Sequence, residues 1–134
     1  MIKKSINYTD LEGNAAVEEA YFNLNKLELL ELNMGVEGGI DGMLNRVSES
    51  NKPSAIFDFI KTFVLKAYGI KSADGKRLDK VVNGKPIADD FAQSEAFAEL
   101  LVSLLSDENE MNAFMLGVLP ASMASEVQKI REQN

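Results

Sequence analysis

The sequence contains neither cysteine nor histidine. Without them there are no disulfides, no thiolate or imidazole metal ligands, and no imidazole to act as a general base near neutral pH. The absence of cysteine and histidine therefore makes catalysis less expected. It does not exclude catalysis, because carboxylates, lysine and serine remain available to an enzyme. A chain without cysteine also fits a reducing compartment.

Long apolar runs are missing as well. The start "MIKKSINYTD" has a basic pair but no apolar run of signal-peptide length, and nowhere do about 18 apolar residues follow one another. The formal charge of −7 opposes general binding to nucleic acid or to an anionic membrane, because both carry phosphate groups. We therefore expect a cytoplasmic protein whose partners are other proteins, with no nucleic acid and no membrane among them.

The composition is that of a folded domain. The chain has 134 residues, of which 46% are hydrophobic and 26% charged, and only three are proline. A chain of this length can bury roughly two thirds of its unfolded surface in one core. We predict a single globular domain over residues 1–120, followed by a C-terminal helix or tail over residues 121–134.

Alternating apolar residues predict a β-hairpin over about residues 2–24. Ile2, Ile6 and Tyr8 fall on one side of the first strand, and "DLEGN" supplies turn residues before the return strand. A two-stranded ribbon is marginal alone, so this hairpin must pack on an apolar neighbour.

The segment "YFNLNKLELLELNM", residues 21–34, predicts a helix that begins after Asn25. Asn25 is a favourable N-cap, and Glu28 three residues later completes a capping box. Leu24, which precedes the cap, can contact Leu29 as a hydrophobic staple.

This helix carries two apolar stripes, which is one more than a surface helix needs. Leu27, Leu30 and Met34 form the first stripe, and Leu29 and Leu32 form the second on the opposite side. One stripe must face the core. The second is either covered by the hairpin or left open for a partner, and we take Leu29 and Leu32 as the candidate partner surface.

Helices are expected from residue 25 onward, so the predicted fold class is mainly α: a small multi-helix domain with an N-terminal β-hairpin packed on it. The apolar residues of "PSAIFDFIKTFVLKAY", residues 53–68, cover nearly half of a helical wheel and predict the core helix. Ser94 and Asp107 are N-cap candidates for two later helices. Gly69 is expected to end the core helix in a left-handed conformation that folds Ile70 back onto Leu65.

Two weaker helical patterns also suit contact with a partner. Ile40 and Met43 lie in a segment softened by several glycines. Met123, Val127 and Ile130 form a thin stripe near the end of the chain. Methionine helps such surfaces because its flexible side chain adapts to varied neighbours.

The polar interval "KSADGKRLDKVVNGKP", residues 71–86, carries a local net charge of +3 in an acidic chain. Its Asp-Gly and Asn-Gly pairs are turn signals. The interval is either a solvated connector or a loop in which Lys76 and Arg77 dock an acidic partner.

Motifs that would carry chemistry are absent. "VEGGIDG" lacks the lysine and spacing of a phosphate-binding loop, and "DENEMNAF" lacks the glycine and the final glutamate of a calcium loop. No catalytic, cofactor or metal residue is therefore predicted. The pattern favours a binding protein over an enzyme.

An ordered set of segments resembles the tail assembly chaperones of long-tailed bacteriophages and prophages of Gram-positive bacteria. The set is "YFNLNKLELLELNM", "EGGI", "FVLKAYGIKSADGKRL", "FAQSEAFAELL" and "FMLGVLP", and the resemblance runs in order through about residues 1–120. The resemblance implies a protein that binds the tape measure protein, recruits tail tube subunits around it, and leaves before the virion is finished. It also implies that a frameshifted longer form of the chain can exist as a further partner.

The predicted function is therefore that of a tail assembly chaperone in the cytoplasm of the bacterial host. An acidic inhibitor or decoy module is the alternative, but it would need carboxylates arrayed on one face, and these are scattered among lysines in the sequence. A small enzyme would need a pocket with convergent polar groups. The candidate partner-binding residues are Leu29, Leu32, Ile40, Met43, Lys76, Arg77, Met123, Val127 and Ile130.

Overall fold

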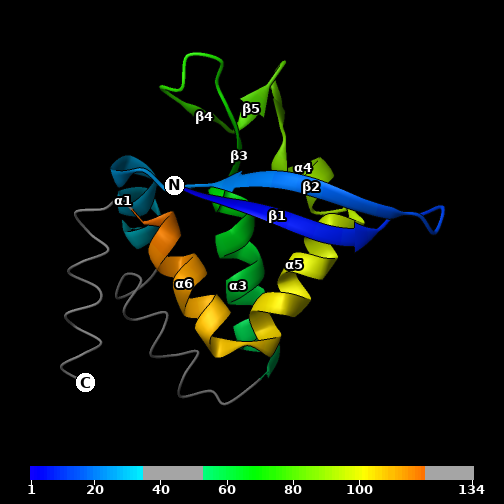
Figure 1. Cartoon of the computed structure of the whole chain (residues 1–134). Helices are drawn as coiled ribbons and strands as arrows, with labels where there is room; N and C mark the ends of the chain where they lie inside the picture. The colour runs from blue at the N-terminus through cyan, green and yellow to red at the C-terminus, as the bar shows by residue number, and fades with distance from the viewer. Residues whose placement is uncertain (35–52, 120–134) are drawn as a thin grey trace.

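A four-stranded antiparallel sheet crosses one side of the protein in the computed structural model, which describes residues 1–34 and 53–119. Figure 1 shows the long strands β1 and β2 lying over helices α3, α5 and α6. The sheet order is β1-β2-β3-β4, formed by Ile2–Thr9, Ala15–Phe22, Tyr68–Lys71 and Leu78–Asp79. A separate two-stranded sheet pairs β5, Val81–Val82, with β6, Lys85–Pro86. The described helices are α1 (Lys26–Met34), α3 (Pro53–Ala67), α4 (Ala88–Phe91), α5 (Glu95–Ser106) and α6 (Glu108–Val118).

The predicted N-terminal hairpin is confirmed. Its register runs from Ile2 opposite Phe22 to Thr9 opposite Ala15. The Asp10 carboxylate orders the turn by accepting hydrogen bonds from the backbone N–H groups of Glu12 and Asn14, at 3.0 and 2.8 Å. A local side-chain acceptor of this kind is the reason Asp favours turns.

The prediction of a mainly α fold was wrong, because the sheet continues beyond the hairpin. Strand β3 directly follows α3 and pairs with β2, placing Tyr68 opposite Phe22. Strand β4 then pairs with β3, placing Leu78 opposite Lys71. The interval 71–86 is thus not simply a connector, since it holds the end of β3 and all of β4, β5 and β6. Strands of two to four residues are too short to show an alternating pattern, and their partners lie far away in the sequence.

The expected helix stop at Gly69 was also wrong. The glycines with positive φ among the described residues are Gly13, Gly75 and Gly84. Gly69 instead permits a close approach: a Cβ there would lie 2.5 Å from Leu78 Cγ and 3.0 Å from the Asp79 carbonyl oxygen. Glycine is required because β4 passes directly over this position.

The Asn-Gly turn signal is confirmed at the tip of the β5–β6 hairpin. Asn83 and Gly84 have φ angles of +53° and +77°. Both angles are positive, as a type I′ two-residue turn requires. The hairpin projects from the protein on the side away from the helices (Figure 1).

The core lies between the hairpin and the helical layer and is rich in aromatic rings. Phe22 lies at its centre, with its ring 5.1 Å from Phe114 and 6.0 Å from Phe91. Phe91 stacks on Tyr68 at 4.0 Å and meets Phe97 edge-on at 5.4 Å. Pairs in these geometries add about 0.5–1.5 kcal/mol each beyond the area they bury. One cluster therefore joins β2, β3, α4, α5 and α6.

The predicted helix starts at Ser94 and Asp107 are confirmed. The Ser94 hydroxyl accepts a hydrogen bond from the Phe97 N–H at the start of α5. The Asp107 carboxylate accepts from the N–H groups of Asn109 and Glu110 at the start of α6. Both caps satisfy donors that the helix itself leaves unpaired.

Replacing Gly69 with alanine is expected to destabilise the protein by about 1–3 kcal/mol, because the new Cβ overlaps Leu78. The free energy of unfolding, measured in urea, gives the cost. In the double variant Gly69→Ala, Leu78→Ala the overlapping atoms of the Leu78 side chain are gone, so its loss of unfolding free energy should be smaller than the sum of the two single losses. Strictly additive losses would contradict the close approach of β4.

Glu18 generates a pH-dependent prediction. Glu18 lies on the same side of β2 as the buried Ala20 and Phe22. Burial raises the pKa of the Glu18 carboxyl. A carboxyl with a raised pKa lowers stability as pH increases through that pKa, since the charged form is the one penalised. Glu18→Gln should therefore raise Tm at pH 7, and this gain should disappear near pH 3.5.

The matched control is Glu19→Gln, on the exposed face of the same strand. This change removes an ion pair with Lys3 (3.2 Å) and should bring no gain at either pH. A Tm gain for Glu18→Gln that is equal at both pH values would show that the charge is not the cause.

Candidate functional site

Helix α1 begins with the predicted capping box. The Asn25 side-chain oxygen accepts a hydrogen bond from the Glu28 N–H at 2.8 Å, and the Glu28 carboxylate accepts one from the Asn25 N–H at 3.1 Å. Each side chain thus satisfies a backbone donor of the other residue. This reciprocal pair sets the residue at which the helix starts.

The Lys80 side chain anchors the start of α1 to the rest of the fold. Its Nζ contacts the Glu28 carboxylate at 2.9 Å, the Asn23 carbonyl oxygen at 2.8 Å and the Lys66 carbonyl oxygen at 2.6 Å. An ammonium group has three donors, and here they meet three acceptors. The end of β2, the end of α3 and the first turn of α1 are held together by this one group.

The two apolar stripes of α1 are placed the other way round from the prediction. Leu29 is only 3% exposed and belongs to the core, whereas Leu27, Leu30 and Met34 are 63%, 53% and 75% exposed. Leu32 is half-buried. The prediction that Leu29 binds a partner was therefore wrong, because its side chain is enclosed by the protein's own core.

The predicted staple already contained the signal that was missed. Leu24 is fully buried, and a residue that staples onto it must point inward with it. Leu29 is that residue, so its stripe faces the core. We define the outward stripe, Leu27, Leu30 and Met34, as the α1 surface.

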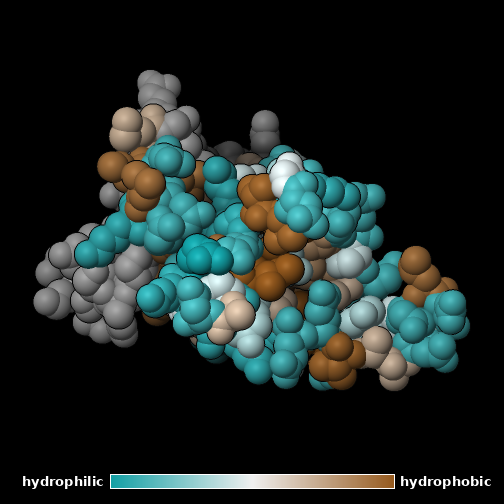
Figure 2. All heavy atoms as spheres, turned by 90° about the horizontal axis from the view of Figure 1, so that it is seen from above, coloured by the Kyte–Doolittle hydropathy of each residue, from teal (hydrophilic) through white to brown (hydrophobic). Residues whose placement is uncertain are grey.

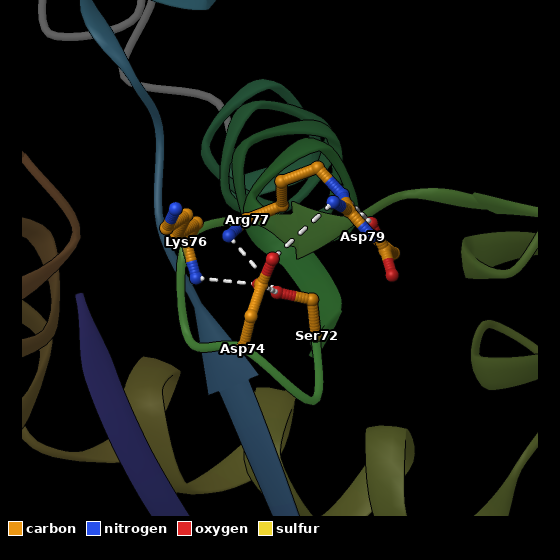
Figure 3. A network of polar contacts seen from close by, with 5 residues as sticks. All are labelled: Ser72, Asp74, Lys76, Arg77 and Asp79. Carbon is orange, nitrogen blue, oxygen red and sulfur yellow. Dashed lines mark hydrogen bonds and ion pairs between the residues drawn. The ribbon is translucent and has the colours of Figure 1, made fainter.

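Lys76 and Arg77 lie in the turn between β3 and β4, where local acids engage Arg77 (Figure 3). Arg77 Nε is 3.0 Å from the Asp79 carboxylate, and its Nη1 is 3.8 Å from the Asp74 carboxylate. The Lys76 N–H donates to Asp74 at 3.0 Å. Each ion pair is exposed and contributes little to stability.

Asp74 is the hub of this turn. Its carboxylate accepts hydrogen bonds from the Ser72 hydroxyl at 2.6 Å and from the Lys76 backbone. The Ser72 bond and then the Lys76 bond lower the pKa of Asp74, because both favour the charged form. The turn therefore uses Arg77 to balance its own carboxylates, which leaves less positive charge for an acidic partner than the sequence suggested.

The remaining candidates, Ile40, Met43, Met123, Val127 and Ile130, lie outside the described residues. The structure instead exposes apolar residues that were not predicted as binding residues. Figure 2 shows apolar patches interrupting a largely hydrophilic surface on the face seen from above. The exposed large apolar residues of the described chain outside the α1 surface are Met1, Leu11, Val17, Ile56, Phe57, Ile70, Val81, Val82, Val102 and Leu105.

No group of three or more acidic residues is placed to hold a metal ion within residues 1–34 and 53–119. In the same ranges, none of the helices is long and apolar enough to cross a membrane.

A hollow of about 320 Å³ lies between β1, α5 and α6. Among its lining residues, Lys4 already pairs with Glu110 at 3.0 Å. Among the rows of apolar side chains on the described helices, the α1 surface is the most exposed.

Comparison with known proteins gives one informative result. A family model described as phage tail assembly chaperone matches residues 1–134. No curated protein and no solved structure matches the chain. The family match confirms the resemblance seen in the sequence at the level of phage tail assembly chaperones.

The inverted stripes of α1 give a direct test with two adjacent residues. Leu29→Ala should cost about 2–5 kcal/mol of unfolding free energy, since it empties part of the core. Leu30→Ala is the same chemical change on the exposed side and should stay within about 0.5 kcal/mol. Urea unfolding of both variants measures the difference, and equal losses would contradict the placement of α1.

Proposed function

We propose that this chain, which belongs to the phage tail assembly chaperone family, binds the tape measure protein and helps bring tail tube subunits to it. It acts in the cytoplasm of the bacterial host and is left out of the finished virion. In this role it is a binding protein and performs no catalysis.

The observation that carries this proposal is the α1 surface. A short helix is held at its start by a capping box and by Lys80, yet presents Leu27, Leu30 and Met34 to the solvent. Residues at these spacings form one row along a helix, which is the pattern that a second amphipathic helix recognises. A client helix that covers the row would remove this apolar surface from water.

The size of this surface favours reversible binding. Covering a half-exposed leucine contributes about 1 kcal/mol, because full burial of such a side chain is worth about 1.5–3 kcal/mol. Three such residues fall well below the roughly 8 kcal/mol that micromolar affinity requires. The client must therefore also use other contacts, and it can be released, as suits a protein that is absent from the final assembly.

The alternative, an acidic inhibitor or decoy module, has less support. The family match points to tail assembly. The α1 surface is apolar, whereas a mimic of nucleic acid would bind through carboxylates. The net charge of −7 serves instead to keep a chaperone with exposed apolar residues in solution.

The double variant Leu27→Gln, Leu30→Gln tests this proposal. Glutamine preserves helix propensity and side-chain length but removes the apolar row. We expect capture of the tape measure protein of the same phage, measured by co-expression and affinity pull-down, to fall by about tenfold or more. Far-UV circular dichroism and Tm should remain those of the parent, because both leucines are exposed.

The matched control is Leu11→Gln, Val17→Gln, which removes two exposed apolar residues from the β1–β2 hairpin. Capture should be unchanged in this variant. The proposal would be wrong if the parent chain does not capture the tape measure protein, or if both double variants lose capture equally.

A further inference from the structure

The negative charge of this protein is concentrated in one stretch. The chain has 21 acidic and 14 basic residues. Residues 86–118 contain seven of the acidic residues and none of the basic ones, so the rest of the chain is neutral overall. The expectation that carboxylates are scattered among lysines is therefore wrong for this stretch. The stretch forms α4, α5 and α6.

Few of these acids are neutralised within the protein. Asp90 pairs with Lys85 at 2.9 Å, and Glu110 pairs with Lys4 at 3.0 Å. Within residues 1–34 and 53–119, no ion pair is formed by Glu95, Glu99 or Glu108. The outer surface of α5 therefore presents charge that the described chain does not balance.

An apolar row runs beside these acids on the outer side of α5. Val102 is 61% exposed and Leu105 is 41% exposed, and Ala98 is exposed one turn earlier. Ala98, Val102 and Leu105 share one row of the helix because they are four and three residues apart. Glu95 and Glu99, also four residues apart, form the neighbouring row.

We propose that this outer face of α5 is a second docking surface and that it binds an amphipathic helix bearing lysine or arginine beside its apolar side chains. Such a helix places its apolar row on Ala98, Val102 and Leu105 and its cations beside Glu95 and Glu99. The charge selects this occupant, since nucleic acid or an acidic helix would be repelled.

The neighbourhood of α5 also has room for long cationic side chains. The hollow of about 320 Å³ between β1, α5 and α6 has Glu99, Glu110 and Lys4 in its walls. Lys4 pairs with Glu110 at 3.0 Å, whereas Glu99 forms no ion pair within residues 1–34 and 53–119. A lysine that extends from the docked helix past Glu99 enters this space. Its (CH₂)₄ stem can pack on apolar surface while the ammonium group stays beside Glu99 and water.

The α5 surface is separate from the α1 surface. Figure 1 shows α1 and α5 on opposite sides of α3 and α6. The two surfaces therefore allow two helical partners to be held at once. This inference does not depend on the identity of the client at α1.

The test uses three synthetic helical peptides with a fluorescent label, measured by anisotropy against the full chain at 150 mM NaCl. The first has a leucine row beside a lysine row, the second replaces the lysines with glutamate, and the third replaces the leucines with serine. We expect saturable binding of the first peptide only. Saturable binding of the glutamate peptide, or equal binding of the serine peptide, would overturn the proposal.

Variants of the protein then locate the site. Val102→Gln with Leu105→Gln, and separately Glu95→Gln with Glu99→Gln, should each weaken binding of the first peptide by about fivefold or more. Glu12→Gln with Glu31→Gln removes the same charge from exposed positions elsewhere and should have little effect. If this control weakens binding as much, or if the α5 variants do not weaken it, the peptide is held by general electrostatics and the proposal is wrong.

A comparison with the α1 variant separates the two proposals. Leu27→Gln with Leu30→Gln should leave binding of the cationic peptide unchanged, while the α5 variants retain capture of the tape measure protein. Loss of peptide binding in the α1 variant would overturn the α5 site. Failure of tape measure capture in the parent chain would overturn the proposed function alone.

Discussion

Two backbone hydrogen bonds join the sheet to the helical layer just after β2. The Asn23 N–H donates to the Ala67 carbonyl at 2.8 Å, and the Leu24 N–H donates to the Val118 carbonyl at 3.0 Å. These carbonyl groups belong to the last residues of α3 and α6. The backbone carbonyl oxygens at the end of a helix have no hydrogen-bond donor within the helix. With the buried Phe22 and Leu24 on either side of Asn23, the chain must leave the sheet at this point and in one direction. The orientation of α1 depends on this junction.

The outward stripe of α1 is a consequence of that orientation. Once Leu24 is buried and Asn25 caps the helix, Leu29 has to point inward and the opposite stripe has to point outward. Lys80 secures the arrangement by satisfying the Asn23 and Lys66 carbonyls together with Glu28. The proposed partner surface thus lies on a helix whose start is held by several hydrogen bonds. Preorganisation of this kind lowers the entropy that binding would otherwise cost.

The distribution of charge bears on the proposed binding of other proteins. The acidic stretch 86–118 covers one part of the molecule, while the balanced remainder includes α1 and the whole sheet. In the part of the chain that the structure describes, one exposed apolar row lies on α1 and another lies beside unbalanced carboxylates on α5. If both proposed surfaces bind helices, their different surroundings would allow the protein to distinguish two partners.

Local features of this protein were determined by its sequence alone. The capping box at Asn25, the caps at Ser94 and Asp107, the N-terminal hairpin and the Asn83-Gly84 turn all depend on neighbouring residues, and short-range hydrogen bonds decide them. Family membership was likewise carried by ordered segments of sequence. Only the tertiary structure decided that β3 and β4 extend the sheet, that Gly69 is needed for the passage of Leu78, and that Leu29 is core while Leu30 is surface. These outcomes depend on contacts between segments far apart in the chain, because burial is a property of the packed whole: the staple pairs Leu29 with Leu24, and only the packed core decides that both face inward.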